Sequence, residues 1–487
     1  MPNGVTRHDG LNASFSQRFK HIAEAGVAMG ISQSREKSGS RSQRGLFLLQ
    51  VIGLATALFG SSWAYGETLK EAVEIALKTN PKVLAADAQK RAVTQDLAQA
   101  KGGYLPNIDL YVANGKEHTD TPQVRAVGTG AATLVHRESS LTLSQKLFDG
   151  RATSSEVERQ NALLSAATNR LDQTREDIAL RAAEVYLDVL KNRQLVKLAN
   201  DNVREHLQTN DKITLRVKGG VSQRADSQQS LARVALAKST VSARAGALRQ
   251  AEAAYQAVIG RPAGVLSDPP PVKSDVTKAG TINSDLLAAT VKQATETAAS
   301  SNPGLLAANA DVSAADAAAR GAKSPYFPRL NLEASINRNQ NLAGIPGNFN
   351  SEALLLVLRW NLFHGGADLA QQRAFAERRF AAMDAAANTR RDVEQRVADA
   401  LYAKATSEER LALLQEYVDL SADVNNSYLQ QLELGRRTLL DVLNAENELF
   451  SARSNYAVGK YEDLLNQYAV EAAQGMLVKS LGINPSE

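Results

Sequence analysis

Two stretches of the sequence, residues 151–218 and 367–434, contain neither glycine nor proline and are rich in Ala, Leu, Gln, Arg and Glu. These residue types favour helix, whereas glycine and proline usually end one. At 1.5 Å per residue, each stretch would form a helix of roughly 100 Å. Such helices do not fit inside a compact globule, so the sequence predicts an elongated, coiled-coil-like helical body.

Both stretches belong to an internal repeat that covers most of the chain. The first copy begins at Asn80 with NPKVLAADAQKRAVTQDLAQAKGGYLPNIDL, and the second begins at Asn302 with NPGLLAANADVSAADAAARGAKSPYFPRLNL. The copies continue with LTLSQKLFDGRA from Leu141 and LVLRWNLFHGGA from Leu356. Each half therefore predicts the same order: a helix, a Tyr-x-Pro phrase, two strands, a Leu-Phe-x-Gly phrase, a very long helix, a glycine break and a return helix.

The ends of the two long helices carry the last part of the repeat. The alignment sets KGGVSQRADSQQSL against LGRRTLLDVLNAENEL. Glycine supplies the turn after each long helix at the lowest steric cost. The alignment pairs Gly219 with Gly435, Ser222 with Thr438 and Asp226 with Asp441.

The repeat also sets the domain organisation. A first repeat is expected over 67–265 and a second over 284–475, with a proline-rich connector over 260–283, a leader over 1–66 and a C-terminal tail over 476–487. The expected elements are strands at about 107–118, 138–147, 329–338 and 352–362, long helices over 151–218 and 367–434, and return helices over 222–259 and 437–473.

The four expected strands alternate apolar and polar residues with a period of two, which separates the two kinds of side chain onto opposite faces of a sheet. Ile108, Leu110 and Val112 illustrate the apolar set. Strands of about ten residues have the length that a tilted strand needs to cross a membrane. The polar segments at about 119–137 and 338–351 would then be external loops. Two soluble hairpins lying on a helical body are the alternative interpretation.

Four strands do not close a barrel, because small barrels need about eight. The chain must therefore oligomerise or keep its strand edges covered, and three copies would supply twelve strands. No stretch after the leader is apolar enough for a spanning helix, so a membrane location would require a barrel.

The leader is typical of an export signal. Arg41 and Arg44 precede the uncharged run GLFLLQVIGLATALFG, and small residues follow it, which predicts cleavage between Gly66 and Glu67. A transmembrane anchor is the alternative, but it needs about 20 apolar residues. Residues 1–66 also carry the whole net charge of +4. The remainder is neutral and shows no basic stripe of the kind that binds nucleic acid.

The sequence gives no sign of catalytic or metal chemistry. It contains no cysteine, which excludes disulfides and thiol catalysis. It has no phosphate-binding glycine loop, and its histidines lack the spacing of metal ligands. We therefore expect no enzyme, no cofactor and no metal site. The histidines are His8, His21, His118, His136, His206 and His364.

Several phrases follow one another in a fixed order: TLKEAVEIALKTNPKV, YLPNIDL, LSQKLFDG, YFPRLNL, LRWNLFHGG and LGRRTLLDVLNAENELFSARSNY. In this order and duplication they resemble the TolC-type outer-membrane efflux proteins over about residues 67–480. The resemblance implies an α+β membrane protein, in which a trimeric twelve-strand β-barrel in the outer membrane continues into a long α-helical coiled-coil barrel across the periplasm. Each chain would add four strands.

The resemblance also implies function and partners. It implies a channel-tunnel that completes a tripartite export system and passively conducts small molecules or secreted protein from an inner-membrane pump. The partners would be two further copies, a periplasmic adaptor, the inner-membrane transporter and outer-membrane lipid, without nucleic acid. The Tyr-x-Pro phrases would mark the helix-to-strand junctions, since proline ends a helix. Their residues are Tyr104, Pro106, Tyr326 and Pro328.

By the same resemblance, acidic residues project into the closed periplasmic mouth. The matching positions are Asp441 and Asn444, which are three residues apart and share a helix face. Asn444 departs from the doubly acidic pattern, so a weaker ring is expected. Three Asp441 carboxylates would favour cations. The alternative is that Asp441 only caps the return helix.

The family also links its two helix hairpins at the closed mouth. Arg437 matches the arginine of that link and Asp226 its facing aspartate, whereas Leu432 stands where a tyrosine is expected. Exposed ion pairs stabilise by about 0–1 kcal/mol, which suits a latch that docking must break. The alternative is a solvated charge on a helix tip. The adaptor would contact the hairpin-tip turns at Gly219, Gly220, Gly435 and Thr438.

A second class of function remains open at this stage: a periplasmic coiled-coil scaffold or adaptor without a pore. The duplicated amphipathic strand pairs distinguish the two classes, because a scaffold has no use for leucine-faced hairpins of membrane length. The cargo, the pump and the adaptor are not determined by the sequence.

Overall fold

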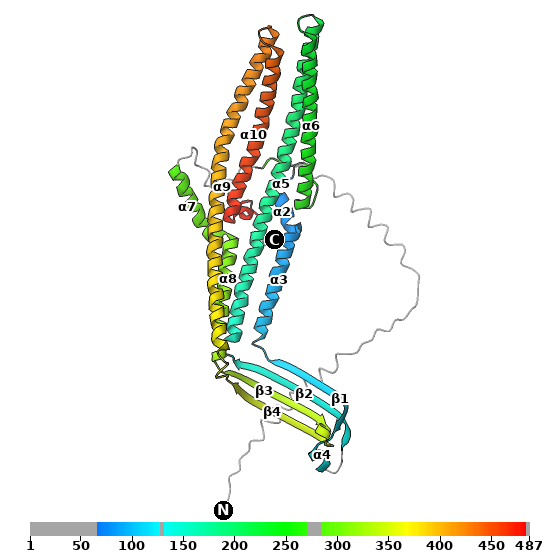
Figure 1. Ribbon diagram of the computed structural model, residues 1–487, viewed down its shortest axis with the longest axis vertical. Coiled ribbons are helices and arrows are strands. Elements are labelled where there is room, and N and C mark those ends of the chain that lie inside the picture. The colour runs from blue at the N-terminus through cyan, green and yellow to red at the C-terminus, as the bar shows by residue number, and fades with distance from the viewer. Residues whose placement is uncertain (1–65, 127–130, 270–283, 484–487) are drawn as a thin grey trace, which may run out of the picture. The chain divides into compact units, whose positions relative to one another are not determined.

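The computed structural model describes residues 66–126, 131–269 and 284–483. The expected signal segment and most of the proline-rich connector therefore lie outside the described residues. The described part of the chain forms long helical hairpins with a four-stranded sheet at one end (Figure 1).

Each repeat supplies one long hairpin. In the first repeat α5 (Ala152–Lys218) packs along α6 (Arg224–Ile259), and in the second α9 (Ala367–Glu433) packs along α10 (Leu439–Gln474) (Figure 1). Contacts between α5 and α10 join the two hairpins. The long helices thus end within one residue of their expected bounds, and the return helices begin two residues later than expected.

Four shorter helices lie alongside α5 and α9. In each repeat, the second of the two shorter helices begins at an Asn-Pro phrase. The Asn80 side chain accepts the N–H of Lys82 at 3.0 Å, and the Asn302 side chain accepts the N–H of Leu305 at 3.2 Å. Asparagine is a good N-cap, and the following proline has no N–H to leave unsatisfied. These helices are α2 (Leu69–Thr79), α3 (Pro81–Gly102), α7 (Ser284–Ser301) and α8 (Pro303–Gly321).

The sheet contains four antiparallel strands in the order β1-β2-β3-β4. Their bounds are β1 Asn107–Thr119, β2 Ala132–Phe148, β3 Arg329–Gln340 and β4 Asn348–Arg359. The pairing of β2 with β3 joins the two repeats. The strands are longer toward the loops than expected, because polar residues beyond the apolar alternation continue the hydrogen-bonded ladder. A short helix, α4 (Pro122–Ala126), occupies part of the first expected loop.

The end of β4 corrects a second expectation. The strand expected to reach 362 ends at Arg359. The following residues turn into α9 through Gly365 and Gly366, whose φ angles are +59° and +81°. Positive φ suits glycine. Residues 360–362, whose apolar pattern predicted strand, therefore belong to the segment that leads into this turn.

The register places apolar side chains on one face across all four strands. Leu110 lies opposite Leu141, Leu141 lies opposite Ile336, and Leu332 lies opposite Leu356. Leu110 is 72% exposed and Leu356 is 63% exposed. The opposite face is mostly polar. The expected two-faced sheet is confirmed, and its apolar face is uncovered in the single chain.

The largest apolar core in the described part of the chain lies midway along α5 and surrounds the fully buried Tyr186. The Tyr186 hydroxyl donates to the backbone oxygens of Glu67 and Ser267, both at 2.6 Å. Apolar residues of α2, α6 and α10 complete this core. It therefore ties the first residues after the expected cleavage site to the long helices.

The C-terminal residues also enter this core. The segment expected as a tail begins with the short helix α11 (Leu477–Ser480), and Leu477 is fully buried. The Glu176 carboxylate of α5 accepts the backbone N–H groups of Leu477 at 2.9 Å and Val478 at 3.2 Å. Burial raises the pKa of Glu176 to about 7, against the opposing effect of these two hydrogen bonds.

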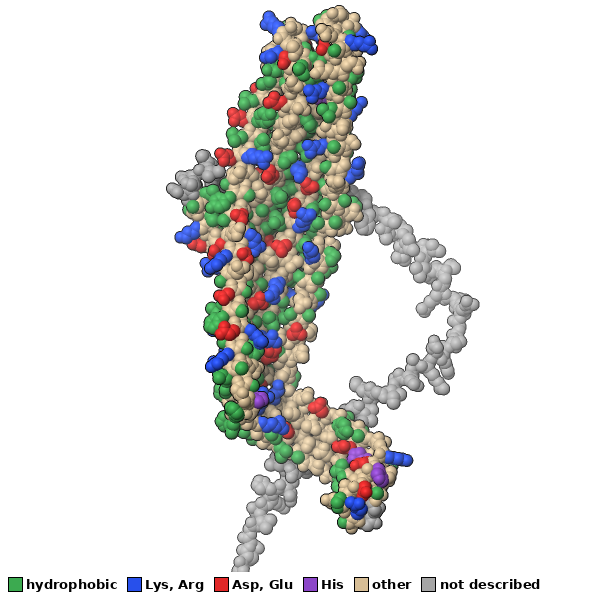
Figure 2. Space-filling view, in the orientation of Figure 1, with side chains coloured by type: hydrophobic (Ala, Val, Ile, Leu, Met, Phe, Trp, Pro, Cys, Tyr) green, Lys and Arg blue, Asp and Glu red, His purple; other side chains and the backbone are tan. Residues whose placement is uncertain are grey.

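Basic and acidic side chains are interspersed along the helices on the face shown in Figure 2 and form no single basic patch there. Within the described ranges, none of the helices is both long enough and apolar enough to span a membrane. Those ranges also hold no group of three or more side chains suited to a metal ion.

Candidate functional site

The tips of the two long hairpins have the same backbone geometry. Gly220 and Gly435 adopt left-handed φ angles of +74° and +69°. The next residue of each turn donates its N–H back into the helix, from Val221 to the carbonyl of Arg216 at 2.9 Å and from Arg436 to the carbonyl of Gln431 at 2.8 Å. This is the hydrogen-bond pattern of a glycine-ended helix.

The geometry corrects the alignment of the two tips. Gly220, not Gly219, is equivalent to Gly435, because Gly219 has an ordinary right-handed φ of −77°. The N-cap residues are Gln223 and Thr438, so the expected pairing of Ser222 with Thr438 is also wrong by one residue. The pairing of Asp226 with Asp441 is confirmed, since both are the third residue of their helix.

Asp441 closes a capping box at the start of α10. Its Oδ2 accepts the Thr438 N–H at 3.2 Å and the Thr438 hydroxyl at 2.8 Å, and its own N–H donates to Thr438 Oγ1 at 3.3 Å. These hydrogen bonds, followed by the charge of Arg437, lower the pKa of the exposed Asp441 carboxyl. In one chain, Asp441 thus acts as a helix cap, which was the alternative to a gate.

Arg437 is held by its own hairpin. Its Nε donates to Gln431 Oε1 at 2.9 Å, and its guanidinium lies 4.2 Å from the centre of the Tyr428 ring. Its nearest carboxylate is Asp441, at 3.9 Å. No ion pair joins Arg437 to Asp226 within the part of the chain that the structure describes. Asp226 instead accepts the Gln223 N–H at 3.1 Å. The expected latch does not form inside one chain.

Other polar contacts join the two hairpins near their tips. Lys212 of α5 pairs with Glu433 of α9 at 2.8 Å, which lowers the pKa of Glu433. Arg216 donates to the Leu432 carbonyl at 3.1 Å. Asn444 accepts a hydrogen bond from Arg233 of α6 at 3.4 Å. The sequence did not reveal these links, because they depend on which faces of four helices meet.

A buried polar cluster lies between α5 and α10, behind the tips. His206 Nδ1 and Glu446 Oε2 are 2.8 Å apart, and Thr209 donates its hydroxyl to Glu446 Oε1 at 2.5 Å. Although close, His206 Nδ1 and Glu446 Oε2 form no hydrogen bond with each other. Both side chains are almost completely buried. Sequence reasoning considered His206 only as a metal ligand and missed its role in joining the hairpins.

The helix-to-strand junctions also repeat. Tyr104 and Pro106 lie between α3 and β1, whereas Tyr326 ends a short 3-10 helix (Ser324–Tyr326) and Pro328 directly precedes β3. The Tyr104 carbonyl accepts a hydrogen bond from Gln145 at 3.0 Å, and the Tyr326 carbonyl accepts one from the Trp360 indole at 3.3 Å. The Tyr-x-Pro phrases therefore mark the positions where helices give way to strands.

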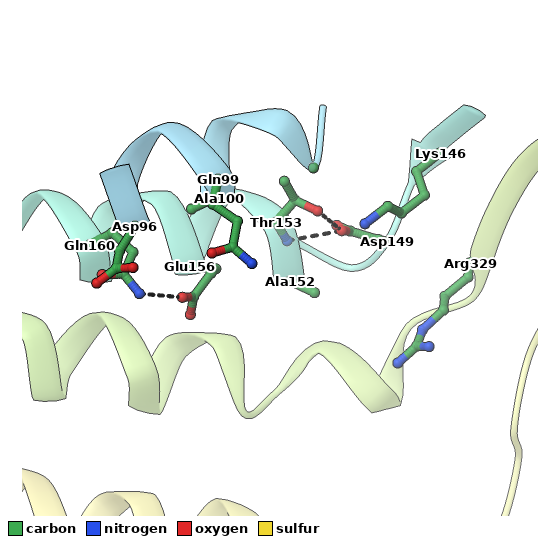
Figure 3. A pocket seen from close by; sticks show the side chains of 11 residues that line it. Asp96, Gln99, Ala100, Lys146, Asp149, Ala152, Thr153, Glu156, Gln160 and Arg329 are labelled. Atoms are coloured by element: carbon green, nitrogen blue, oxygen red, sulfur yellow. Dashed lines mark hydrogen bonds between the residues drawn. The ribbon is translucent and has the colours of Figure 1, made fainter. Parts of the chain in front are cut away.

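A cavity of about 530 Å³ opens beside the first junction. Asp149 there accepts the backbone N–H of Thr153 at 2.9 Å and also its hydroxyl, near the start of α5. Figure 3 shows Lys146 and Arg329 extending from neighbouring strands on the side of Asp149 away from α5. The cavity is polar, with charges of both signs.

The sequence matches the outer membrane efflux protein family over residues 72–261 and 294–476, so the chain belongs to this family. It is 25% identical over 441 residues to the outer membrane efflux protein BepC of Brucella suis biovar 1 (strain 1330), covering 90% of this chain and 91% of that protein. It is 24% identical over 430 residues to the alkaline protease secretion protein AprF of Pseudomonas aeruginosa, covering 84% and 86%.

The fold is similar to that of the outer membrane protein VceC from Vibrio cholerae, with a TM-score of 0.70 and 16% identity over 85% of this chain and 96% of that one. Family and relatives identify this chain as an outer-membrane channel-tunnel of tripartite export that extends into the periplasm. The alternative of a scaffold without a pore is therefore set aside.

Proposed function

We propose that three copies of this chain close a twelve-stranded barrel, which continues into a tunnel of helices. The proposal rests mainly on the register of the sheet, which places apolar side chains on one face across all four strands. The outer edges of β1 and β4 pair with no strand in the described part of the chain. In a membrane such edges are satisfied only when the sheet closes, and neighbouring copies supply the missing strands.

The hairpin tips form the gate in this proposal. Three copies of Asp441 surround the periplasmic mouth and favour cations, with Asn444 one turn further along each helix. The lowered pKa of Asp441 supports this role, because the carboxylate stays ionised in mild acid. Arg437 of one copy faces Asp226 of its neighbour, so the latch lies between chains.

The conduit is passive and is not an enzyme. An inner-membrane transporter supplies the cargo, and a periplasmic adaptor docks at the tip turns around Gly219, Gly220, Gly435 and Thr438. The named relatives support two cargo classes, since BepC is an efflux protein and AprF a protease secretion protein. The cargo is therefore a small molecule or a secreted protein.

Single-channel conductance in a planar bilayer tests the conduit and the latch together. The wild type is expected to show a small cation-selective conductance that rises in Arg437→Ser and stays unchanged in the neighbouring Arg436→Ser. Asp226→Asn keeps an oxygen for the Gln223 N–H but loses the charge, so it separates the latch from helix capping. A rise in Arg437→Ser alone would assign Arg437 to its own hairpin. A well-folded trimer without conductance would overturn the conduit.

A further inference from the structure

Three basic side chains lie near one another on one face of the sheet, at the end nearest the helices. Arg329 of β3 lies directly opposite Arg359 of β4, and Lys146 of β2 pairs with Asn331, two residues along β3. Because side chains alternate along a strand, all three belong to the polar face. We refer to Lys146, Arg329 and Arg359 as the basic row.

The basic row is only partly neutralised. Arg359 pairs with Glu333 of the same face at 3.0 Å. Among the described residues, no ion pair or hydrogen bond involves the side chain of Lys146 or Arg329. Like charges placed directly opposite each other destabilise a strand pair. The Arg329–Arg359 pairing therefore has a cost, and no carboxylate of the described residues pairs with Arg329 to offset it.

The row also lines an open cavity of about 770 Å³ between the sheet and the start of α9. The cavity is lined by His364 and Trp360 as well, and its acidic side chains already have partners. Asp149 accepts two hydrogen bonds from Thr153, and Asp368 pairs with His364 at 3.4 Å. The cavity therefore presents two unpaired cations beside an aromatic ring.

We propose that the basic row is an anion-binding belt inside the conduit, which holds negatively charged groups of a solute at the passage from helices to strands. This inference rests on the proposed conduit, in which the polar face of the sheet lines the lumen. β2 and β3 are the central strands of the sheet, so a neighbouring chain cannot cover Lys146 or Arg329 by adding a strand. Clefts lined by one sign of charge concentrate ions of the other sign.

Block of single-channel current by tripolyphosphate, added to each side of the bilayer in turn, tests the belt. Tripolyphosphate is expected to block the wild type from one side. In Lys146→Gln/Arg329→Gln the half-blocking concentration is expected to rise about tenfold, because three chains together lose six positive charges. The matched control is Arg338→Gln, on the same strand but on the apolar face, where Arg338 pairs with Glu352. Tripolyphosphate should block this control at the same half-blocking concentration as the wild type.

The outcomes separate the belt from the conduit. Channels that conduct but are not blocked, or that are blocked equally in the wild type and the double variant, would overturn the belt and leave the conduit intact. An equal loss of block in Arg338→Gln would also overturn it, because the effect would then reflect net charge alone. A wild-type trimer without current would overturn the conduit and the belt with it. Trimer formation by each variant is checked by size-exclusion chromatography.

Discussion

The middle of the helical body and the hairpin tips are held together in different ways. The middle contains the large core around Tyr186, built from α2, α5, α6 and α10. The small apolar cluster at the tips contains Ile213, Leu432, Leu439, Val442 and Leu443, and exposed polar contacts such as Lys212–Glu433 surround it. Apolar burial resists separation more than exposed ion pairs do. The comparison indicates that the middle is rigid and that the tips separate at a lower cost in free energy.

Truncation at the middle should have the largest effect on stability. Tyr186→Ala removes a fully buried ring and two hydrogen bonds, so we expect the free energy of unfolding to fall by about 4 kcal/mol. Tyr186→Phe keeps the ring and removes the hydroxyl donor from the Ser267 carbonyl, whereas the Glu67 carbonyl still accepts the Ser267 N–H at 3.0 Å. Its expected cost is about 1–2 kcal/mol. Urea unfolding of the detergent-extracted protein, followed by far-UV circular dichroism, measures both. Equal losses in the two variants would show that hydrogen bonding, not packing, dominates there.

The buried pair behind the tips should come next. Glu446→Ala leaves Thr209 buried without its acceptor and His206 buried without the neighbouring carboxylate, and the expected loss is about 3 kcal/mol. Hydrogen exchange should show the loss at residues 200–218 and 439–450, with protection around Tyr186 preserved.

A double variant checks whether the pair itself matters. His206→Leu/Glu446→Leu replaces two buried polar side chains by apolar ones of similar size, and it should recover most of the stability lost in Glu446→Ala. If the stability loss in the double variant instead equals the sum of the losses in the two single variants, the two side chains do not act as a pair. The middle and the tips would then differ less in stability than the structure indicates.

Glu176 makes the stability of the middle of the helical body depend on pH. Its folded-state pKa, raised by burial to about 7, lies above its ordinary value of 4.5, so the folded state binds the extra proton. Stability is therefore highest in acid and falls as the pH rises through about 7, by roughly 2 kcal/mol between pH 5 and pH 8. Glu176→Gln should flatten this part of the profile. A wild-type profile that rises over the same range would contradict the assignment to Glu176.

Much of the fold follows from the sequence, because repeats, breaks and periodicity are local signals. The runs without glycine or proline gave α5 and α9 to within a residue, and the alternation of Leu110 and its neighbours gave the two-faced sheet. The bounds of β2 did not follow, since its outer half is held by pairing with β1, not by an apolar pattern.

The site was less predictable, for a different reason. The sequence indicated that Asp226 and Asp441 are equivalent, but the turn geometry of Gly220 was needed to align the rest of the tips. The contacts of Lys212, His206 and Glu446 join residues more than 200 positions apart and depend on how four helices rotate against one another. No local pattern carries that information.

The smallest expected effect on stability lies at the exposed links of the tips. Lys212→Ala removes the ion pair with Glu433, which is solvated on both sides, so the urea midpoint should not change measurably. Hydrogen exchange at residues 213–218 should accelerate by about two- to fivefold, because exposed contacts limit local opening there. Lys197→Ala, a lysine of α5 outside the tip contacts, is the matched control and should leave this exchange unchanged. Faster exchange around Tyr186 as well would show that tips and middle open as one unit, and the distinction between a rigid middle and separable tips would fail.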